Sequence, residues 1–141
     1  GAPMKVSIIM PVLNQLELTK ICVESIIKNT WDVEHEIIVI DNASTDGTGG
    51  YLAEKKISCI TNRENAGVAA SWNAGVRAAK GEYVCVINND IVVSEGWLSS
   101  LIEFYERHPD AGIVSPGTRW GELDYDFEPY AFLLRENERG G

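Results

Sequence analysis

The chain has 141 residues and a formal net charge of −9 at pH 7, with a sequence pI near 4.6. Its hydrophobic fraction of 45% and charged fraction of 23% are ordinary for a globular protein, and the length is sufficient for one domain with a buried core. The acidic balance argues against nucleic-acid binding, which usually requires a basic face, and no apolar run approaches the roughly 20 residues of a membrane span.

Short apolar runs rich in β-branched residues predict the strands of a buried sheet. The first run, Val6 to Met10, stops at Pro11, which we expect to end the strand. The other predicted strands are residues 36–40, 57–60 and 83–87, with one more short strand at Ile113-Val114.

Helical patterns fill the segments between these strands. In the first segment, Leu18, Ile21 and Cys22 share one helix face at three- and four-residue steps. We expect Gly81 to close the third helix as a C-cap, and Pro109 to stop the last one. The predicted helices, in chain order, cover about residues 17–28, a short segment with Asp46 or Thr48 as N-cap, residues 68–79 and about residues 96–107.

Strands that alternate with helices predict an α/β fold with a mostly parallel sheet and right-handed crossovers. Residues 4–116 carry this pattern and form the predicted domain, whereas residues 1–3 resemble a cloning scar. From about residue 117 the pattern ends in an aromatic and acidic segment. We expect residues 117–141 to begin a further region that packs on a later part of a longer chain.

The three cysteines, Cys22, Cys59 and Cys85, are odd in number and show no C-x-x-C spacing. We interpret all three as small apolar core residues in a reducing compartment, rather than as disulfide partners or zinc ligands. The sequence also shows no charged-then-apolar secretory leader. The expected location is therefore the cytoplasm, with peripheral attachment at the inner face of the membrane as an alternative.

Two of the predicted strands end on polar groups. The strand at residues 83–87 runs into Asn88-Asn89-Asp90, and the strand at residues 36–40 runs into Asp41-Asn42. In open α/β sheets, ligands bind at the carboxyl ends of the strands. The two strand ends therefore predict a site for a polar ligand that carries phosphate and a metal ion.

The loop after the first strand argues against the glycine-rich nucleotide folds. It reads Pro11-Val12-Leu13-Asn14, without the glycines of a dinucleotide fingerprint, and the chain has no Gly-Lys-Ser or Gly-Lys-Thr for a P-loop. A divalent cation is then the natural partner of phosphate on an acidic protein. Asp90 is the best candidate ligand, with the alternative that it only begins a turn or caps the following segment.

Six short segments follow one another in order: residues 7–14 (SIIMPVLN), 40–48 (IDNASTDGT), 65–67 (NAG), 73–75 (NAG), 81–83 (GEY) and 88–90 (NND). Together they resemble the family 2 glycosyltransferases, which are inverting enzymes of the GT-A fold. The resemblance covers about residues 5–116, and each segment alone is weak. It implies a Rossmann-like GT-A three-layer sandwich with a mostly parallel central sheet, truncated in this chain.

The resemblance also implies a role for each matching residue. The segment from Pro11 to Asn14 would line the pocket for the base and ribose of the donor nucleotide. Asp90 would bind the divalent metal, Mn²⁺ or Mg²⁺, as the last acid of the D-x-D element. The residues implied in donor binding are Pro11, Val12, Leu13, Asn14, Asp41, Asn42, Gly67, Asn73, Asn88 and Asn89.

Four positions depart from the family pattern. Asn42 stands where many members place an aspartate that reads uracil, although an amide oxygen can still accept from the ring N–H of uracil or thymine. Asn88 removes the first acid of D-x-D, and Leu13 stands where an aromatic often stacks on the base. Trp72 stands where an arginine is common, either as core filler or as part of a differently shaped pocket.

The implied reaction transfers a sugar from a nucleotide-diphosphate donor, by preference a UDP- or dTDP-sugar, to a hydroxyl of a saccharide or lipid-linked acceptor, as in cell-surface polysaccharide biosynthesis. The catalytic general base would lie outside this chain, because the acids of residues 122–128 are more simply read as a solvated tail. The alternative is a non-catalytic nucleotide-sugar-binding or regulatory domain. A phosphoacceptor receiver domain is disfavoured, since no paired acids follow the first strand.

Overall fold

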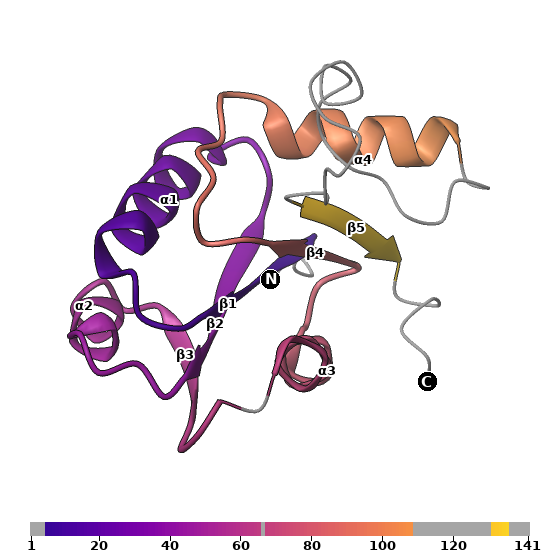
Figure 1. Ribbon diagram of the computed structural model, residues 1–141. Coiled ribbons are helices and arrows are strands. Elements are labelled where there is room, and N and C mark those ends of the chain that lie inside the picture. Colours follow the sequence, from indigo (N-terminus) through magenta and orange to yellow (C-terminus); the bar gives the residue numbers. More distant parts are fainter. Residues whose placement is uncertain (1–4, 66, 109–130, 136–141) are drawn as a thin grey trace, which may run out of the picture.

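The computed structural model describes residues 5–65, 67–108 and 131–135 of the chain. Strands and helices alternate through this part, as the sequence predicts (Figure 1). The strands are β1 (Val6–Val12), β2 (His35–Asn42), β3 (Ser58–Asn62), β4 (Tyr83–Ile87) and β5 (Ala131–Arg135). The helices are α1 (Leu16–Asn29), α2 (Thr48–Glu54), α3 (Val68–Ala78) and α4 (Trp97–Arg107).

The strands form one sheet in the order β3-β2-β1-β4-β5. The first four strands in this order are mutually parallel, and β5 pairs antiparallel with β4. The prediction of an α/β fold with a mostly parallel sheet is therefore confirmed. Among the described residues, no helix is sufficiently long and apolar to span a bilayer.

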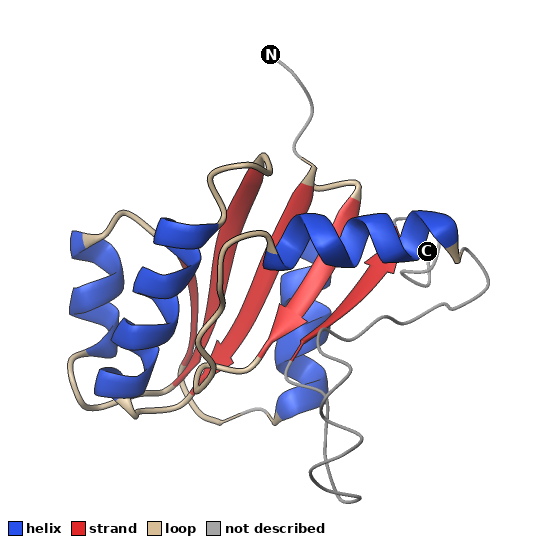
Figure 2. Ribbon diagram, turned by 90° about the horizontal axis from the view of Figure 1, so that it is seen from above, coloured by secondary structure: helices blue, strands red, loops and turns tan. Residues whose placement is uncertain are grey.

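Helices cover both faces of the sheet, so that two cores form. Helices α1, α2 and α4 lie on one face and α3 lies on the other (Figures 1 and 2). Successive side chains of a strand point to opposite faces, so Ile8 and Met10 of β1 join the first core while Ile9 joins the second. Strands covered on both faces read as continuous apolar runs, which is why their positions were predictable.

Strand β1 continues past Pro11, which the sequence analysis expected to end it. The register of β1 with β2 extends to Val12, paired with Asp41, whereas the register with β4 ends at Ile9. Beyond Ile9, β1 therefore has a strand neighbour on one side only. A proline, which lacks the backbone N–H, is tolerated in a strand where one side has no ladder to complete.

Gly81 has a different role from the predicted helix C-cap. Helix α3 ends with Ala79 in an extended conformation, and Gly81 lies against the start of β1. Its backbone N–H donates to the Ser7 Oγ at 2.8 Å. A Cβ at this position would lie 2.6 Å from the Ser7 nitrogen and 2.8 Å from the Tyr83 oxygen. The glycine is therefore required by close backbone packing.

Other sequence expectations need smaller corrections. The N-cap of α2 is Gly47, with φ of 91°, while the neighbouring Asp46 carboxylate accepts from the Thr48 N–H. Cys59 is exposed rather than in the core, whereas Cys22 and Cys85 are buried as predicted. Strand β5 was not predicted, and the strand expected at Ile113-Val114 lies outside the described residues.

The Gly81→Ala variant should be destabilised by about 1–3 kcal/mol, because its Cβ would overlap backbone atoms that cannot move independently. Urea unfolding at equilibrium measures this cost. Gly50→Ala in α2 is the control, since a Cβ there meets nothing within 4 Å and alanine favours a helix. A Gly81→Ala protein as stable as the Gly50→Ala protein would contradict the close-packing explanation.

Candidate functional site

The candidate site lies at the carboxyl ends of the four parallel strands, whose arrowheads point to the same edge of the sheet (Figure 2). The chain runs outward from β1 through β2 to β3 and then returns to β4 on the other side of β1. The strand order therefore reverses at β1, and α3, the helix that leads to β4, covers the face of the sheet opposite α1 and α2. Such a switch point leaves a crevice in which α/β proteins bind their ligands.

The side chains of Asp41 and Asn42, the last two residues of β2, point to opposite faces of the sheet. The Asp41 side chain is 3% exposed and lies on the α2 side, where its Oδ1 accepts from the Ser44 N–H at 3.0 Å. The Asn42 side chain is 6% exposed and lies on the α3 side. The two residues therefore belong to different polar clusters, although they are adjacent in the sequence.

Asn42 joins three elements through its amide group. Its Nδ2 donates to the Ser71 Oγ of α3 at 2.7 Å, and its Oδ1 accepts from the Asn62 Nδ2 at 2.8 Å. The Ser71 Oγ also lies 2.9 Å from the carbonyl oxygen of Gly67, which begins α3 with φ of 86°. This cluster holds the start of α3 against the ends of β2 and β3.

Asn62 and Ser71 were missed as site residues by the sequence analysis. A signal for Asn62 was present, because it ends β3 as Asn42 ends β2, and the two residues are paired in the sheet register. Ser71 gave no such signal, since a serine inside a helix of small residues is unremarkable. Its contact with Asn42 arises only from the packing of α3 on the sheet.

The loops after β1 and β2 are bonded to each other. The Asn14 backbone N–H donates to the Ser44 Oγ, and the Asn14 Oδ1 accepts from the Thr45 N–H, both at 2.7 Å. Asn14, Gln15 and Ala43 have φ values of 55°, 61° and 70°, in the left-handed region that non-glycine residues rarely adopt. These reciprocal bonds stabilise conformations that neither loop would favour alone.

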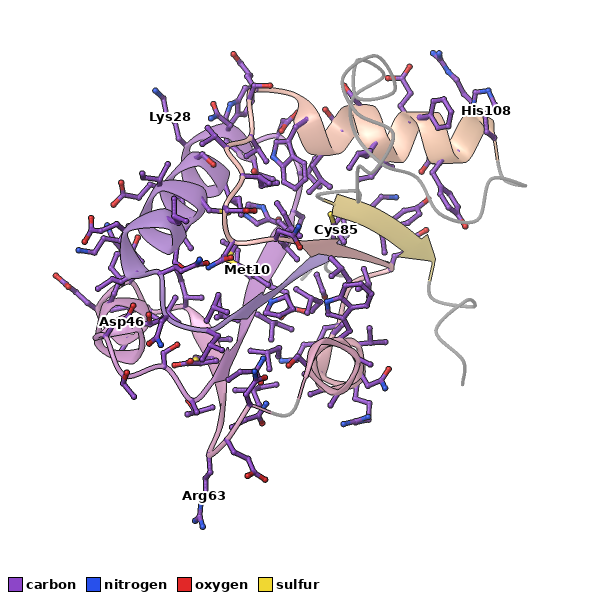
Figure 3. The ribbon with its side chains drawn as sticks, viewed as in Figure 1. Met10, Lys28, Asp46, Arg63, Cys85 and His108 are labelled. Atoms are coloured by element: carbon purple, nitrogen blue, oxygen red, sulfur yellow. The ribbon has the colours of Figure 1, made fainter. Side chains whose placement is uncertain are left out.

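Asp46 fixes the start of α1 at this edge, where it lies beside α2 (Figure 3). Its Oδ2 accepts from the Leu16 N–H at 2.9 Å, so the chain's own carboxylate caps the positive end of α1. The hydrogen bond from the Thr48 hydroxyl, together with the bonds from backbone N–H groups, holds the pKa of the Asp46 carboxyl below its usual range.

The segment that carries Asp90 lies along α1. The Asn89 Nδ2 donates to the Thr19 Oγ1 at 3.1 Å, and the Asn88 carbonyl accepts from the Cys22 thiol at 3.6 Å. Burial raises the pKa of the Cys22 thiol to about 12, so the thiol keeps its proton at neutral pH. Asp90 itself is exposed, at the same edge as the loops after β1 and β2.

The remaining predicted positions differ in how they can act. The Val12 side chain is buried in the first core, so only its backbone can contact a ligand. Leu13, by contrast, is 41% exposed, and Asn73 of α3 is also exposed. Trp72 packs partly buried against the second core, which supports its interpretation as core filler.

No three His, Cys, Asp or Glu side chains in the described part of the chain lie together as a metal centre. Asp90 would thus offer a single carboxylate. Mg²⁺ and Mn²⁺ are commonly held by one or two carboxylates together with phosphate oxygens of the substrate, rather than by a complete cage of protein ligands. The exposed carboxylate of Asp90 fits such a shared site.

Comparison with known proteins agrees with this geometry. Residues 7–137 match the model of Glycosyl transferase family 2. The chain belongs to this family. The match spans the sheet and both polar clusters, so the resemblance stated from six short segments is confirmed over most of the sequence.

Related proteins are longer than this chain. The glycosyltransferase GlyG of Streptococcus pneumoniae is 26% identical over 130 residues, which are 89% of this chain and 43% of the relative. The poly(ribitol-phosphate) beta-glucosyltransferase of Bacillus spizizenii is 34% identical over 109 residues, which are 72% of this chain and 17% of that protein. The chain thus spans less than half the length of these relatives.

Solved structures of glycosyltransferases share the fold. The mannosyltransferase PcManGT from Pyrobaculum calidifontis, in complex with GDP-Man and Mn²⁺, has a TM-score of 0.80 at 23% identity and aligns with 96% of this chain and 47% of its own. TarS 1-349 of S. aureus in complex with UDP-GlcNAc has a TM-score of 0.67 at 24% identity, covering 75% of this chain and 32% of its own. The predicted GT-A architecture is therefore confirmed.

Replacing Asp46 with asparagine should destabilise the protein at neutral pH and leave it little changed in acid. The pKa of Asp46 is lowered in the folded state, so its carboxylate stabilises the fold above the unfolded-state pKa of about 3.9 and this contribution fades as the pH falls through the folded-state pKa. Thermal unfolding of both proteins from pH 7 to pH 3 measures the difference.

The control for this series is Asp32→Asn, which changes an exposed acid at the opposite edge of the sheet. Its curve should follow that of the unmodified protein across the range. An Asp46→Asn protein whose deficit stayed constant down to pH 3 would show that the carboxylate charge is not what stabilises this loop.

Proposed function

We propose that this chain is the donor-binding part of an inverting glycosyltransferase, which moves a sugar from a nucleoside-diphosphate donor to an acceptor hydroxyl. The observation that carries the proposal is the exposed Asp90 beside a preformed pair of loops, at the switch point of a GT-A sheet. The names of the family relatives, which include several glycosyltransferases, support it.

We assign the nucleoside to the loops after β1 and β2. The bonds between Asn14 and residues 44–45 hold the two loops in place without a ligand. The entropy lost in ordering these loops on binding is therefore smaller. Leu13 offers an exposed apolar side chain on which the face of a base can lie. Pro11 and Val12 would contribute their backbone, while Asn42, Gly67 and Asn73 would approach from the α3 side.

We assign the diphosphate and metal to the segment after β4. Asp90 would hold Mn²⁺ or Mg²⁺ together with diphosphate oxygens, and such an ion neutralises charge on the departing nucleoside diphosphate. Asn88 and Asn89 are neutral, so Asp90 supplies the negative charge of this triplet. Their bonds to α1 hold the backbone that precedes the carboxylate in place.

The acceptor hydroxyl would attack the anomeric carbon from the side opposite the leaving group, which inverts its configuration. We place the general base in a region outside residues 4–116, with residues 117–141 as the start of the acceptor side. We also place the reaction in the cytoplasm, because Cys22, Cys59 and Cys85 are all free thiols, which fits a reducing compartment.

Calorimetric titration with UDP, dTDP and GDP, each with and without Mn²⁺, tests the donor site. We expect binding of UDP or dTDP that depends on Mn²⁺ and that weakens at least tenfold in Asp90→Ala, since the variant removes the proposed metal ligand. The control is Glu95→Ala, which removes an equal charge from an exposed position in the same connection.

Equal weakening in the two variants would mean that only the general negative potential matters, and would contradict a ligand role for Asp90. Binding that ignored Mn²⁺ would likewise count against the metal. Tighter binding of GDP than of UDP would keep the metal site and reject the uridine or thymidine preference.

A further inference from the structure

A polar stripe runs along α1 beneath the segment that carries Asp90. The stripe consists of Thr19, Cys22, Ser25 and Asn29, spaced at three, three and four residues, so that the four side chains share one face of the helix. Each of them bonds the segment of residues 88–93. Apolar side chains would suffice to pack the segment against α1. The four hydrogen bonds indicate that the position of the segment is also fixed.

The contacts hold the segment at both ends. At one end, Asn88 and Asn89 are bonded to Cys22 and Thr19. At the other end, the Val93 N–H donates to the Ser25 Oγ at 3.1 Å and the Val93 carbonyl accepts from the Asn29 Nδ2 at 3.0 Å. Only three residues, 90–92, lie between the anchors, and Asp90 is the first of them.

The anchor nearest to Asp90 is the bond between Thr19 and Asn89. The Thr19 side chain is fully buried, and its Oγ1 accepts from the Asn89 Nδ2 at 3.1 Å. Holding the side chain of the preceding residue fixes the backbone from which the Asp90 carboxylate extends. The carboxylate is exposed, so this neighbouring anchor restricts where it can lie.

We propose that Thr19 is a positioning residue that acts through Asn89 to hold the Asp90 carboxylate where it binds the metal with the donor diphosphate. The inference rests on the proposed function, because it assigns Asp90 the metal. Thr19 itself touches neither metal nor donor. Outer contacts that orient a metal ligand commonly contribute 10–100-fold in metal affinity, so a loss near the lower end is expected for a contact one residue removed.

The test is a titration of Mn²⁺ into the protein at saturating UDP, with unbound Mn²⁺ counted by electron paramagnetic resonance. Thr19→Val keeps the side-chain shape but removes the acceptor, and should weaken Mn²⁺ binding about tenfold. Thr19→Ser keeps the hydroxyl and should bind Mn²⁺ nearly as well as the unmodified protein. This readout counts bound metal and is independent of sugar transfer.

Thr30→Val is the matched control. Thr30 is also fully buried, and its Oγ1 accepts from another side-chain N–H, the Trp97 Nε1 at 2.9 Å. Removing its hydroxyl makes the same chemical change away from the site. If Thr19→Val and Thr30→Val lose similar unfolding free energy but only Thr19→Val loses Mn²⁺ affinity, the positioning role is supported; unchanged Mn²⁺ affinity in Thr19→Val overturns it.

Asn89→Ala provides a second route in case Thr19→Val does not fold. It removes the donor of the same bond and should weaken Mn²⁺ binding to a similar extent, while the double variant should be no weaker than either single one. Additive losses would overturn the proposal. Asp90→Ala distinguishes the proposed function from the positioning role. If Asp90→Ala binds Mn²⁺ as well as the unmodified protein, the metal role in the proposed function fails. If Asp90→Ala loses Mn²⁺ affinity while Thr19→Val keeps it, only the positioning role is refuted.

Discussion

The position of β1 between two parallel neighbours determines where chemistry can occur in this molecule. Because β1 pairs with β2 on one side and β4 on the other, the strand order reverses at β1, and α3, the helix that leads to β4, covers the face opposite α1. All four parallel strands end at the same edge, so their terminal polar residues gather there. The sheet itself is held by two apolar cores that leave this edge free.

Polar contacts organise that edge, in addition to the apolar packing of Val12 and Val93. Asn14 and residues 44–45 hold two loops together in left-handed conformations, and the stripe on α1 holds the segment after β4. Hydrogen bonds are directional, so they fix positions more sharply than apolar contacts of similar strength. An edge organised in this way suits a ligand such as a diphosphate, which must be met by groups at defined places.

The sequence predicted the fold well because the parallel strands are covered on both faces and therefore read as unbroken apolar runs. It predicted less where the reason lay in tertiary contacts. Gly81 resembles a C-cap locally, but its conformation is imposed by the backbone of Ser7. Nothing in the local sequence marks Thr19 as more than a helix residue, because its partner Asn89 lies 70 residues later. Family resemblance supplied the site positions, whereas the contacts among them became visible only in the structure.

The asparagine at position 42 is consistent with its surroundings. The Ser71 hydroxyl oxygen lies 2.9 Å from the Gly67 carbonyl and 3.0 Å from the Asn42 Oδ1, and when Ser71 accepts from the Asn42 Nδ2 its single hydrogen has the Gly67 carbonyl as the acceptor outside that amide. An aspartate at this position has no hydrogen to donate, so it would compete for the Ser71 hydroxyl hydrogen, and the Gly67 carbonyl would keep only its bond from the Ser71 backbone N–H at 3.2 Å. Asn62 donates to Oδ1 in either case. The amide at position 42 is therefore matched to Ser71, because it supplies a donor that leaves the Ser71 hydroxyl hydrogen for the Gly67 carbonyl.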